Sequence, residues 1–101
     1  LLNIEKKSES KEAINYLKKS IHLNPNNAHA WYLLSRAYAQ IGSLPLANYA
    51  TAERYFLTGE RSLSYEFASK ALKNIEENSP EWYRSSDLIE ILKKDSLERQ
   101  P

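Results

Sequence analysis

The 101-residue sequence contains no cysteine and no methionine, and it has only two glycines and four prolines. Without cysteine, a disulfide framework, a thiolate zinc site and a cysteine nucleophile are all excluded. No apolar run approaches the ~20 residues that cross a membrane, so we expect no membrane insertion. The length corresponds to one small domain. The missing initiator methionine indicates a piece of a longer chain.

Neither sign of charge dominates, because 14 lysines and arginines face 13 aspartates and glutamates, for a net charge of +1. This balance removes the electrostatic argument for a nucleic-acid partner. The two histidines, His22 and His29, are seven residues apart with no H-E-x-x-H motif. The sequence therefore predicts no metal site, no cofactor and no catalytic residues in this segment.

Valine is absent and threonine occurs only twice, which disfavours strands and indicates an all-α fold. Turn-forming residues divide the chain at Asn24-Pro25-Asn26-Asn27, at Gly42-Ser43, at Gly59 and at Ser79-Pro80. Between these breaks the apolar residues recur with a helical period. The expected helices are residues 10–23, 28–41, 44–58, 61–76 and 81–94.

Both ends of the chain carry further expectations. Leu1, Leu2 and Ile4 are interpreted as the truncated end of a preceding helix, which the polar run 6–10 connects to the next one. Residues 1–95 form the predicted single helical domain. Residues 96–101 are predicted to be a frayed tail.

A repeat pattern runs through the centre of the sequence. The spacing Trp31-x2-Leu34-Ser35-x2-Tyr38, followed by Gly42 and Ala47, resembles the tetratricopeptide repeat (TPR). This resemblance implies a right-handed superhelix of antiparallel helix hairpins that binds polypeptide partners. The residues assigned to structural TPR positions are Ala13, Leu17, Pro25, Trp31, Leu34, Tyr38, Gly42, Ala47, Tyr55, Gly59 and Ala71.

The sequence departs from the repeat in the helix expected at 44–58. Thr51 and Arg54 stand where a large apolar residue and an alanine are usual, and the motif restarts half a repeat later at Tyr55 and Gly59. This helix is therefore predicted to belong to two successive hairpins.

A narrower resemblance covers residues 11–94. The phrases Ala52-Glu53-Arg54-Tyr55 and Trp82-Tyr83-Arg84 are similar to the C-terminal TPR region of BepA-like (YfgC-like) zinc metalloproteases. The resemblance implies the partner-binding arm of a bacterial periplasmic protease that acts in outer-membrane protein quality control, with its catalytic domain upstream. The alternative is a stand-alone, cytoplasmic TPR adaptor or scaffold without a protease.

The expected binding groove is a polar face of the helix at 28–41, where TPR modules usually meet peptides. Its candidate residues are Asn27, His29, Tyr32, Arg36 and Gln40. Arg36 would bind a carboxylate and Asn27 would bind peptide backbone. The alternative is an ordinary solvated face. Tyr49, Phe56 and Leu57 are expected to pack on neighbouring helices rather than to form an exposed aromatic patch.

Overall fold

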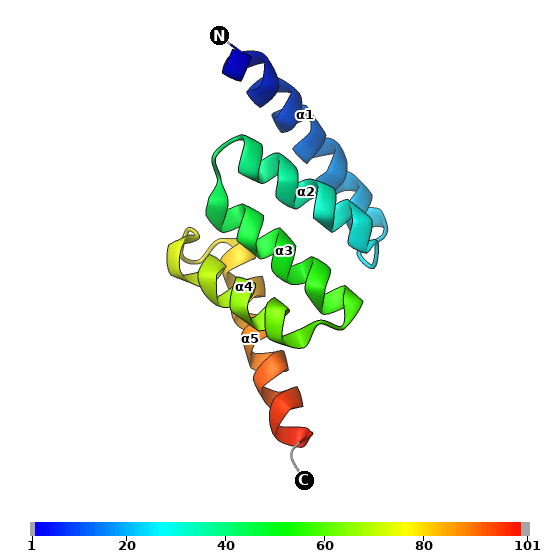
Figure 1. Cartoon of the computed structure of the whole chain (residues 1–101), viewed down its shortest axis with the longest axis vertical. Coiled ribbons are helices and arrows are strands. Elements are labelled where there is room, and N and C mark those ends of the chain that lie inside the picture. The colour runs from blue at the N-terminus through cyan, green and yellow to red at the C-terminus, as the bar shows by residue number, and fades with distance from the viewer. Residues whose placement is uncertain (1, 100–101) are drawn as a thin grey trace.

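The computed structural model describes residues 2–99, with side chains from residue 4, and contains five α-helices over that range. They are α1 (Leu2–Leu23), α2 (Ala28–Gln40), α3 (Leu44–Thr58), α4 (Arg61–Asn74) and α5 (Pro80–Glu98), as Figure 1 shows. No strand occurs within residues 2–99, so the predicted all-α fold is confirmed.

The helix ends follow from local chemistry at the predicted breaks. Asn27 caps α2, since its side-chain oxygen accepts a hydrogen bond from the Ala30 N–H at 3.1 Å. Ser79 caps α5 by accepting from the Trp82 N–H at 3.1 Å. Gly59 ends α3 in the left-handed conformation with a φ of 81°, which a residue without Cβ adopts at little cost.

The predicted break near the N-terminus is wrong. Helix α1 runs without interruption through residues 6–10, so Leu2 and Ile4 belong to the same helix as Leu17. The polar run contains no proline or glycine that would interrupt helical hydrogen bonding, and lysine and glutamate are good helix formers. Residues 6–10 therefore form part of a solvated stretch of helix α1. Ile4, one turn earlier, is also exposed. Leu1 lies outside the described residues.

Two predicted boundaries near the C-terminus also shift. Helix α4 ends at Asn74, because Ile75 adopts an extended conformation and buries its side chain. Helix α5 continues to Glu98, so residues 96–98 are helical rather than frayed. Residues 100 and 101 of the predicted tail lie outside the described range.

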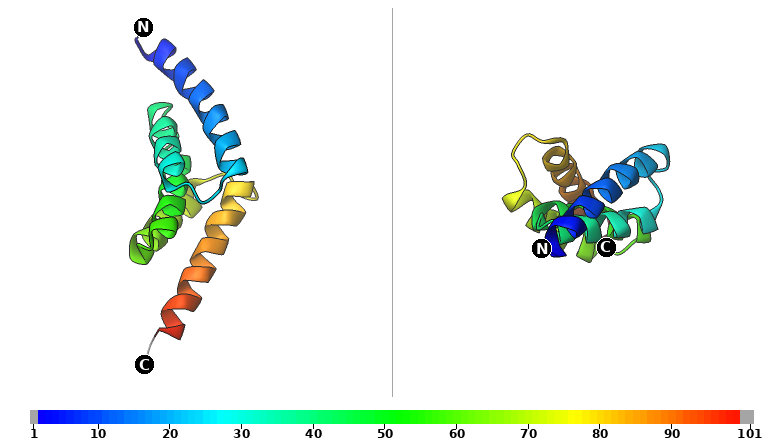
Figure 2. Two further views of the ribbon diagram at one scale, coloured as in Figure 1. Left: turned by 90° about the vertical axis from the view of Figure 1, so that its right-hand side faces the viewer. Right: turned by 90° about the horizontal axis from the view of Figure 1, so that it is seen from above.

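The helices form an elongated array of 56 × 26 × 20 Å. Helices α2, α3 and α4 lie side by side in one layer, and α1 and α5 lie on the same side of that layer (Figure 2). Helix α1 packs against α2, whereas α5 packs against α4 and also touches α3. Helix α3 contacts both α2 and α4, as predicted for a helix shared by two hairpins.

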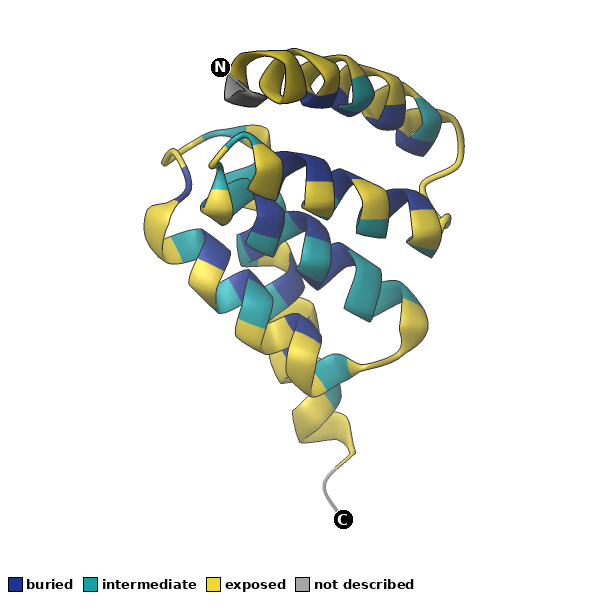
Figure 3. Cartoon of the chain, turned by 45° about the horizontal axis from the view of Figure 1, so that its top comes forward, coloured by how far each residue is buried: buried dark blue, intermediate teal, exposed yellow. Residues whose placement is uncertain are grey.

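The core has two parts that meet along α3, and buried residues line the facing sides of the helices (Figure 3). The first part joins α1, α2 and α3. Its buried residues are Ile14, Leu17, Ile21, Ala30, Trp31, Leu34, Ala37, Tyr38, Ala47 and Ala50. The second part joins α3, α4 and α5 and is made of Ala52, Ala68, Leu88 and Leu92.

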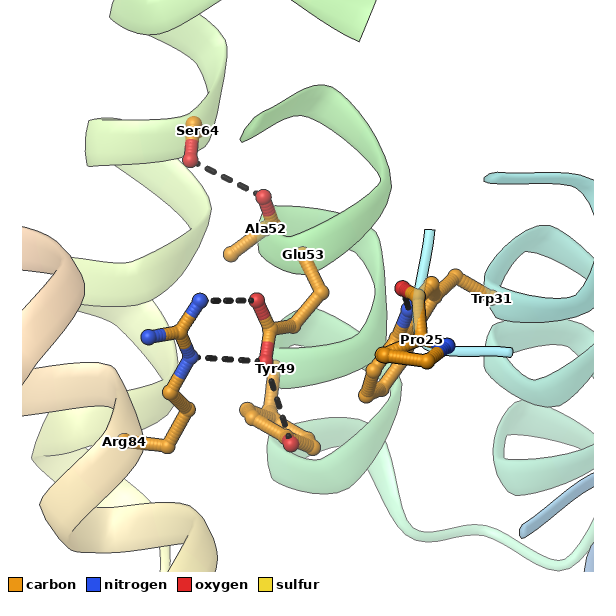
Figure 4. Close-up of polar contacts among 7 residues, drawn as sticks. All are labelled: Pro25, Trp31, Tyr49, Ala52, Glu53, Ser64 and Arg84. Atoms are coloured by element: carbon orange, nitrogen blue, oxygen red, sulfur yellow. Dashed lines mark hydrogen bonds and ion pairs between the residues drawn. The ribbon is translucent and has the colours of Figure 1, made fainter. Parts of the chain in front are cut away.

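Small residues allow close contact in the second part of the core. Ala52, Ser64 and Ala68 are fully buried between α3 and α4. The Ser64 hydroxyl donates to the Ala52 carbonyl oxygen at 2.9 Å (Figure 4), which satisfies a polar group that burial would otherwise destabilise. The fully buried Ser85 hydroxyl, by contrast, has no hydrogen-bond partner among the described residues.

Candidate partner-binding site

The five predicted groove residues have different surroundings. Asn27 serves as the cap of α2. Gln40 accepts a hydrogen bond from the buried Ser10 hydroxyl at 2.7 Å, which ties the end of α2 to α1. Both side chains therefore have structural contacts, and their binding of a partner stays a prediction.

The other three predicted residues lie together on α2. The His29 and Tyr32 rings are 6.0 Å apart. Arg36 donates to the Tyr32 hydroxyl at 3.3 Å, and its guanidinium lies 5.8 Å from the Tyr32 ring. Spacings of three and four residues place these side chains on one face of the helix.

The same surface continues onto α3 through Arg54. Its guanidinium carbon lies 4.8 Å from the Tyr32 ring centre and 5.1 Å from the Tyr55 ring centre. Each contact falls within the ~6 Å range of cation–π attraction. Arg54 therefore connects an aromatic ring of α2 to one of α3.

The surface then crosses to α4. The Tyr55 and Phe67 rings are 5.8 Å apart, and the Lys70 ammonium lies 4.9 Å from the Phe67 ring centre. Lys70 also pairs with Glu66 at 3.4 Å. We call this arrangement across three helices the aromatic–cation row; it consists of Tyr32, Arg54, Tyr55, Phe67 and Lys70.

On α3, the aromatic–cation row faces away from α5. Glu53 points toward α5, because its carboxylate binds Arg84 of that helix. Tyr55 follows Glu53 by two positions, which is about 200° around a helix, so it points to the opposite face. Tyr32, Arg54, Tyr55 and Phe67 are all half-buried. These four side chains are therefore held by their neighbours and remain partly accessible to solvent.

The guanidinium of Arg54 carries unused hydrogen-bonding capacity. Within residues 2–99 it contacts two rings, and no hydrogen-bond acceptor lies against it. An arginine has five N–H donors, and ring contacts occupy only the face of its plane. The edge of this group is therefore available to a carboxylate or a carbonyl of a partner.

A buried polar group on the opposite face of α3 holds that helix against α5. Arg84 donates to both carboxylate oxygens of Glu53, at 2.9 Å from Nε and 3.0 Å from Nη2 (Figure 4). The Tyr49 hydroxyl donates to the same carboxylate at 3.3 Å. The hydrogen bond to Glu53 raises the pKa of Arg84 above its usual value. Burial, together with the Glu53 charge, raises the pKa of Tyr49.

The three apolar side chains of α3 that are expected to pack on neighbouring helices lie against the core. Tyr49 and Leu57 pack against the first part of the core, and Phe56 packs against the second. The Trp31 ring meets the Tyr49 ring edge-on at 5.6 Å, and its Nε1 donates to the Pro25 carbonyl oxygen at 3.1 Å. Trp31 therefore lies buried in the first part of the core.

Sequence reasoning missed four members of the aromatic–cation row as binding residues. The repeat pattern gives Tyr55 a structural position, the helical period places Phe67 on the apolar face of its helix, and Lys70 has no pattern that marks it. Arg54 was recognised as a departure from the repeat. It is also one of only three charged residues within 26–59, and that isolation was the available signal. Its position between two rings of different helices required the tertiary structure.

Among residues 2–99, no group of three or more histidine, aspartate or glutamate side chains is placed to hold a metal ion. No helix in the same range is both long and apolar enough to cross a membrane.

Five layered helices with short connections form an α-helical array, an arrangement typical of helical repeat proteins. Residues 8–55 match the family model described as tetratricopeptide repeat. This match covers α2 and most of α1 and α3, and it supports a TPR repeat family with a TPR-like all-α fold. No solved structure matches the chain.

Proposed function

We propose that this chain is a protein-interaction module that binds a polypeptide partner across the exposed face of α2, α3 and α4. The single observation that carries this proposal is the aromatic–cation row. Its half-buried rings and its guanidinium are ordered by contacts between helices before any partner arrives. Such order lowers the entropy lost on binding.

The chemistry of the surface favours a partner segment with carboxylates. Arg36 and Arg54 flank Tyr32, so two guanidinium groups lie next to one ring. Guanidinium groups recognise carboxylates through paired hydrogen bonds, and rings at the same site can cover apolar side chains. An acidic segment with interspersed apolar residues fits both features.

Peptide selection followed by charge-removing variants tests this proposal. A displayed random peptide library is selected on the wild-type chain, and the enriched peptides are measured by fluorescence anisotropy against Arg36→Ala and Arg54→Met. We expect each variant to weaken binding about fivefold or more, which corresponds to about 1 kcal/mol for a partly exposed ion pair. The melting midpoint should change little for Arg36→Ala, since that side chain is exposed.

Lys19→Met provides the matched control, because Lys19 is an exposed cation on α1, which carries no residue of the row. It removes the same charge and should leave affinity within twofold. If the selected peptides bind both arginine variants as tightly as the wild type, this face is not the binding surface.

We further propose that the module is the C-terminal arm of a BepA-like periplasmic zinc metalloprotease. The support is the sequence phrase around Ala52-Glu53-Arg54-Tyr55 together with Trp82-Tyr83-Arg84. The reading frame upstream of Leu1 tests it: an H-E-x-x-H helix behind a secretory signal is the expected finding. Further TPR hairpins in its place would favour the alternative, a stand-alone cytoplasmic adaptor.

A further inference from the structure

A cleft lies between the start of α4 and the last turns of α5. This cleft has a volume of about 480 Å³, within the range of ~300–1,000 Å³ typical of binding clefts. We call it the α4–α5 cleft. It is lined by Arg61, Ser62, Tyr65, Leu92, Lys93, Ser96 and Arg99.

The α4–α5 cleft and the row occupy opposite sides of α4. Tyr65 lines the cleft and Phe67 belongs to the row. These residues are two positions apart, which places their side chains about 200° apart around the helix. A ligand in the cleft would therefore leave the row uncovered.

The charges that line the cleft are all positive. Arg61 is already paired with Asp95 of α5. Lys93 and Arg99 are exposed, and the structure pairs neither with a carboxylate within residues 2–99. With a rise of about 1.5 Å per residue, the backbone positions of Lys93 and Arg99, six residues apart, lie about 9 Å apart along the direction of α5. Among the described residues, the cleft therefore presents two cations that no carboxylate pairs.

The cleft lining also contains two apolar side chains, Leu92 and Tyr65. Tyr65 supplies most of the accessible apolar surface, because it is 38% exposed and Leu92 only 4%. Serine hydroxyls at Ser62 and Ser96 complete the lining. An aromatic side chain that lies against Leu92 and Tyr65 would bury apolar area, while acidic residues on either side of it would reach the two cations.

We propose that the α4–α5 cleft is a second docking site, which binds an extended acidic polypeptide segment with an aromatic residue between its carboxylates. In an extended chain, residues two positions apart are about 7 Å apart and those four positions apart about 13 Å. The separation of about 9 Å between the backbone positions of Lys93 and Arg99 lies between these two values. This site is independent of the proposed function of the row.

The probe is a fluorescein-labelled peptide of sequence Gly-Glu-Glu-Phe-Glu-Glu-Gly, measured by fluorescence anisotropy on the intact chain. The cleft variant is the double substitution Lys93→Glu with Arg99→Glu. We expect it to weaken binding at least about tenfold, and we expect higher salt to weaken wild-type binding. Replacing the glutamates of the peptide by glutamine should produce a similar loss.

The matched control is Lys94→Glu combined with Lys73→Glu. It changes the net charge by the same amount at exposed positions outside the cleft lining. This control should alter affinity less than about twofold. Far-UV circular dichroism verifies the fold of each variant. Amide chemical shifts of the wild type provide a second readout, with changes expected at Ser62, Tyr65 and Ser96.

Several results would overturn the proposal. If the cleft variant and the control variant lose peptide affinity equally, the peptide is held by the net charge of the chain and not by the cleft. Shift changes confined to the row would place the peptide on the other face, and the proposed function of the row would survive that result. Tighter binding of a single-stranded oligonucleotide than of the peptide would make the ligand a nucleic acid. A dimer that the cleft variant dissociates would make the occupant a second copy of this chain.

Discussion

The buried ion pair between Glu53 and Arg84 makes a direct prediction about what holds α5 onto the helical layer. The substitution Arg84→Met removes the guanidinium but keeps an apolar stem next to Phe56, whose ring lies 5.8 Å from the guanidinium carbon. It leaves the Glu53 carboxylate, whose side chain is 8% exposed, with the Tyr49 hydroxyl as its remaining side-chain partner.

The expected loss follows from the burial of the two partners. Removing one partner of a buried ion pair destabilises a protein by about 3–5 kcal/mol. The Arg84 side chain is itself 38% exposed, so water reaches the site and reduces the loss to about 2–3 kcal/mol. Glu53→Gln should cost about 2 kcal/mol, since the amide can accept only one of the two N–H bonds.

Urea denaturation of the two single variants and the double variant measures this coupling. We expect the double variant to lose about 3 kcal/mol, which is about 1.5 kcal/mol less than the sum of the single losses. The control Lys94→Met, on the exposed side of the same helix, should stay within about 0.5 kcal/mol of the wild type. A coupling energy below about 0.5 kcal/mol would refute the claim that this pair fastens α5 to α3.

Three further perturbations test the core and the turns. Trp31→Ala should lower the free energy of unfolding by about 3–5 kcal/mol, because Trp31 is 7% exposed and its loss leaves a cavity; a change below 1 kcal/mol in urea denaturation would contradict its place in the core. Burial and the Glu81 charge raise the pKa of Tyr38 to about 12 from its ordinary value of 10, so between these pH values the folded state holds a proton that the unfolded state releases. The contribution of Tyr38 to the free energy of unfolding should therefore be constant well below pH 10 and should fall as the pH rises toward 12, by up to ~1.4 kcal/mol per pH unit. The pKa of Tyr49 is also raised in the folded state, so Tyr49 adds to this slope. Denaturation at several pH values measures the slope, and a flat profile would show that burial does not hold the hydroxyl neutral. Gly59→Ala should cost about 1 kcal/mol in thermal melts, since a φ of 81° is unfavourable for alanine although no atom lies within 4 Å of the added Cβ; an unchanged midpoint would mean that the turn relaxes.

Much of the helical framework could be predicted because it depends on local chemistry. Asn27, Ser79 and Gly59 mark helix ends through capping and positive φ, which are properties of a residue and its immediate neighbours. The failed break at residues 6–10 has the same explanation. A polar run without proline or glycine does not stop a helix. Polar composition is common to turns and to solvated helical turns, so it does not distinguish them.

The amino-acid sequence alone determined the all-α class, the positions of most helices, and the alternation of large and small residues that forms the core around Trp31. These features arise from interactions between residues close together along the chain. Only the tertiary structure decided which side chains from different helices meet. It placed Arg54 between rings of α2 and α3, and it paired Glu53 with Arg84, which is 31 residues away. Those contacts depend on the crossing of whole helices, and no local pattern specifies that geometry.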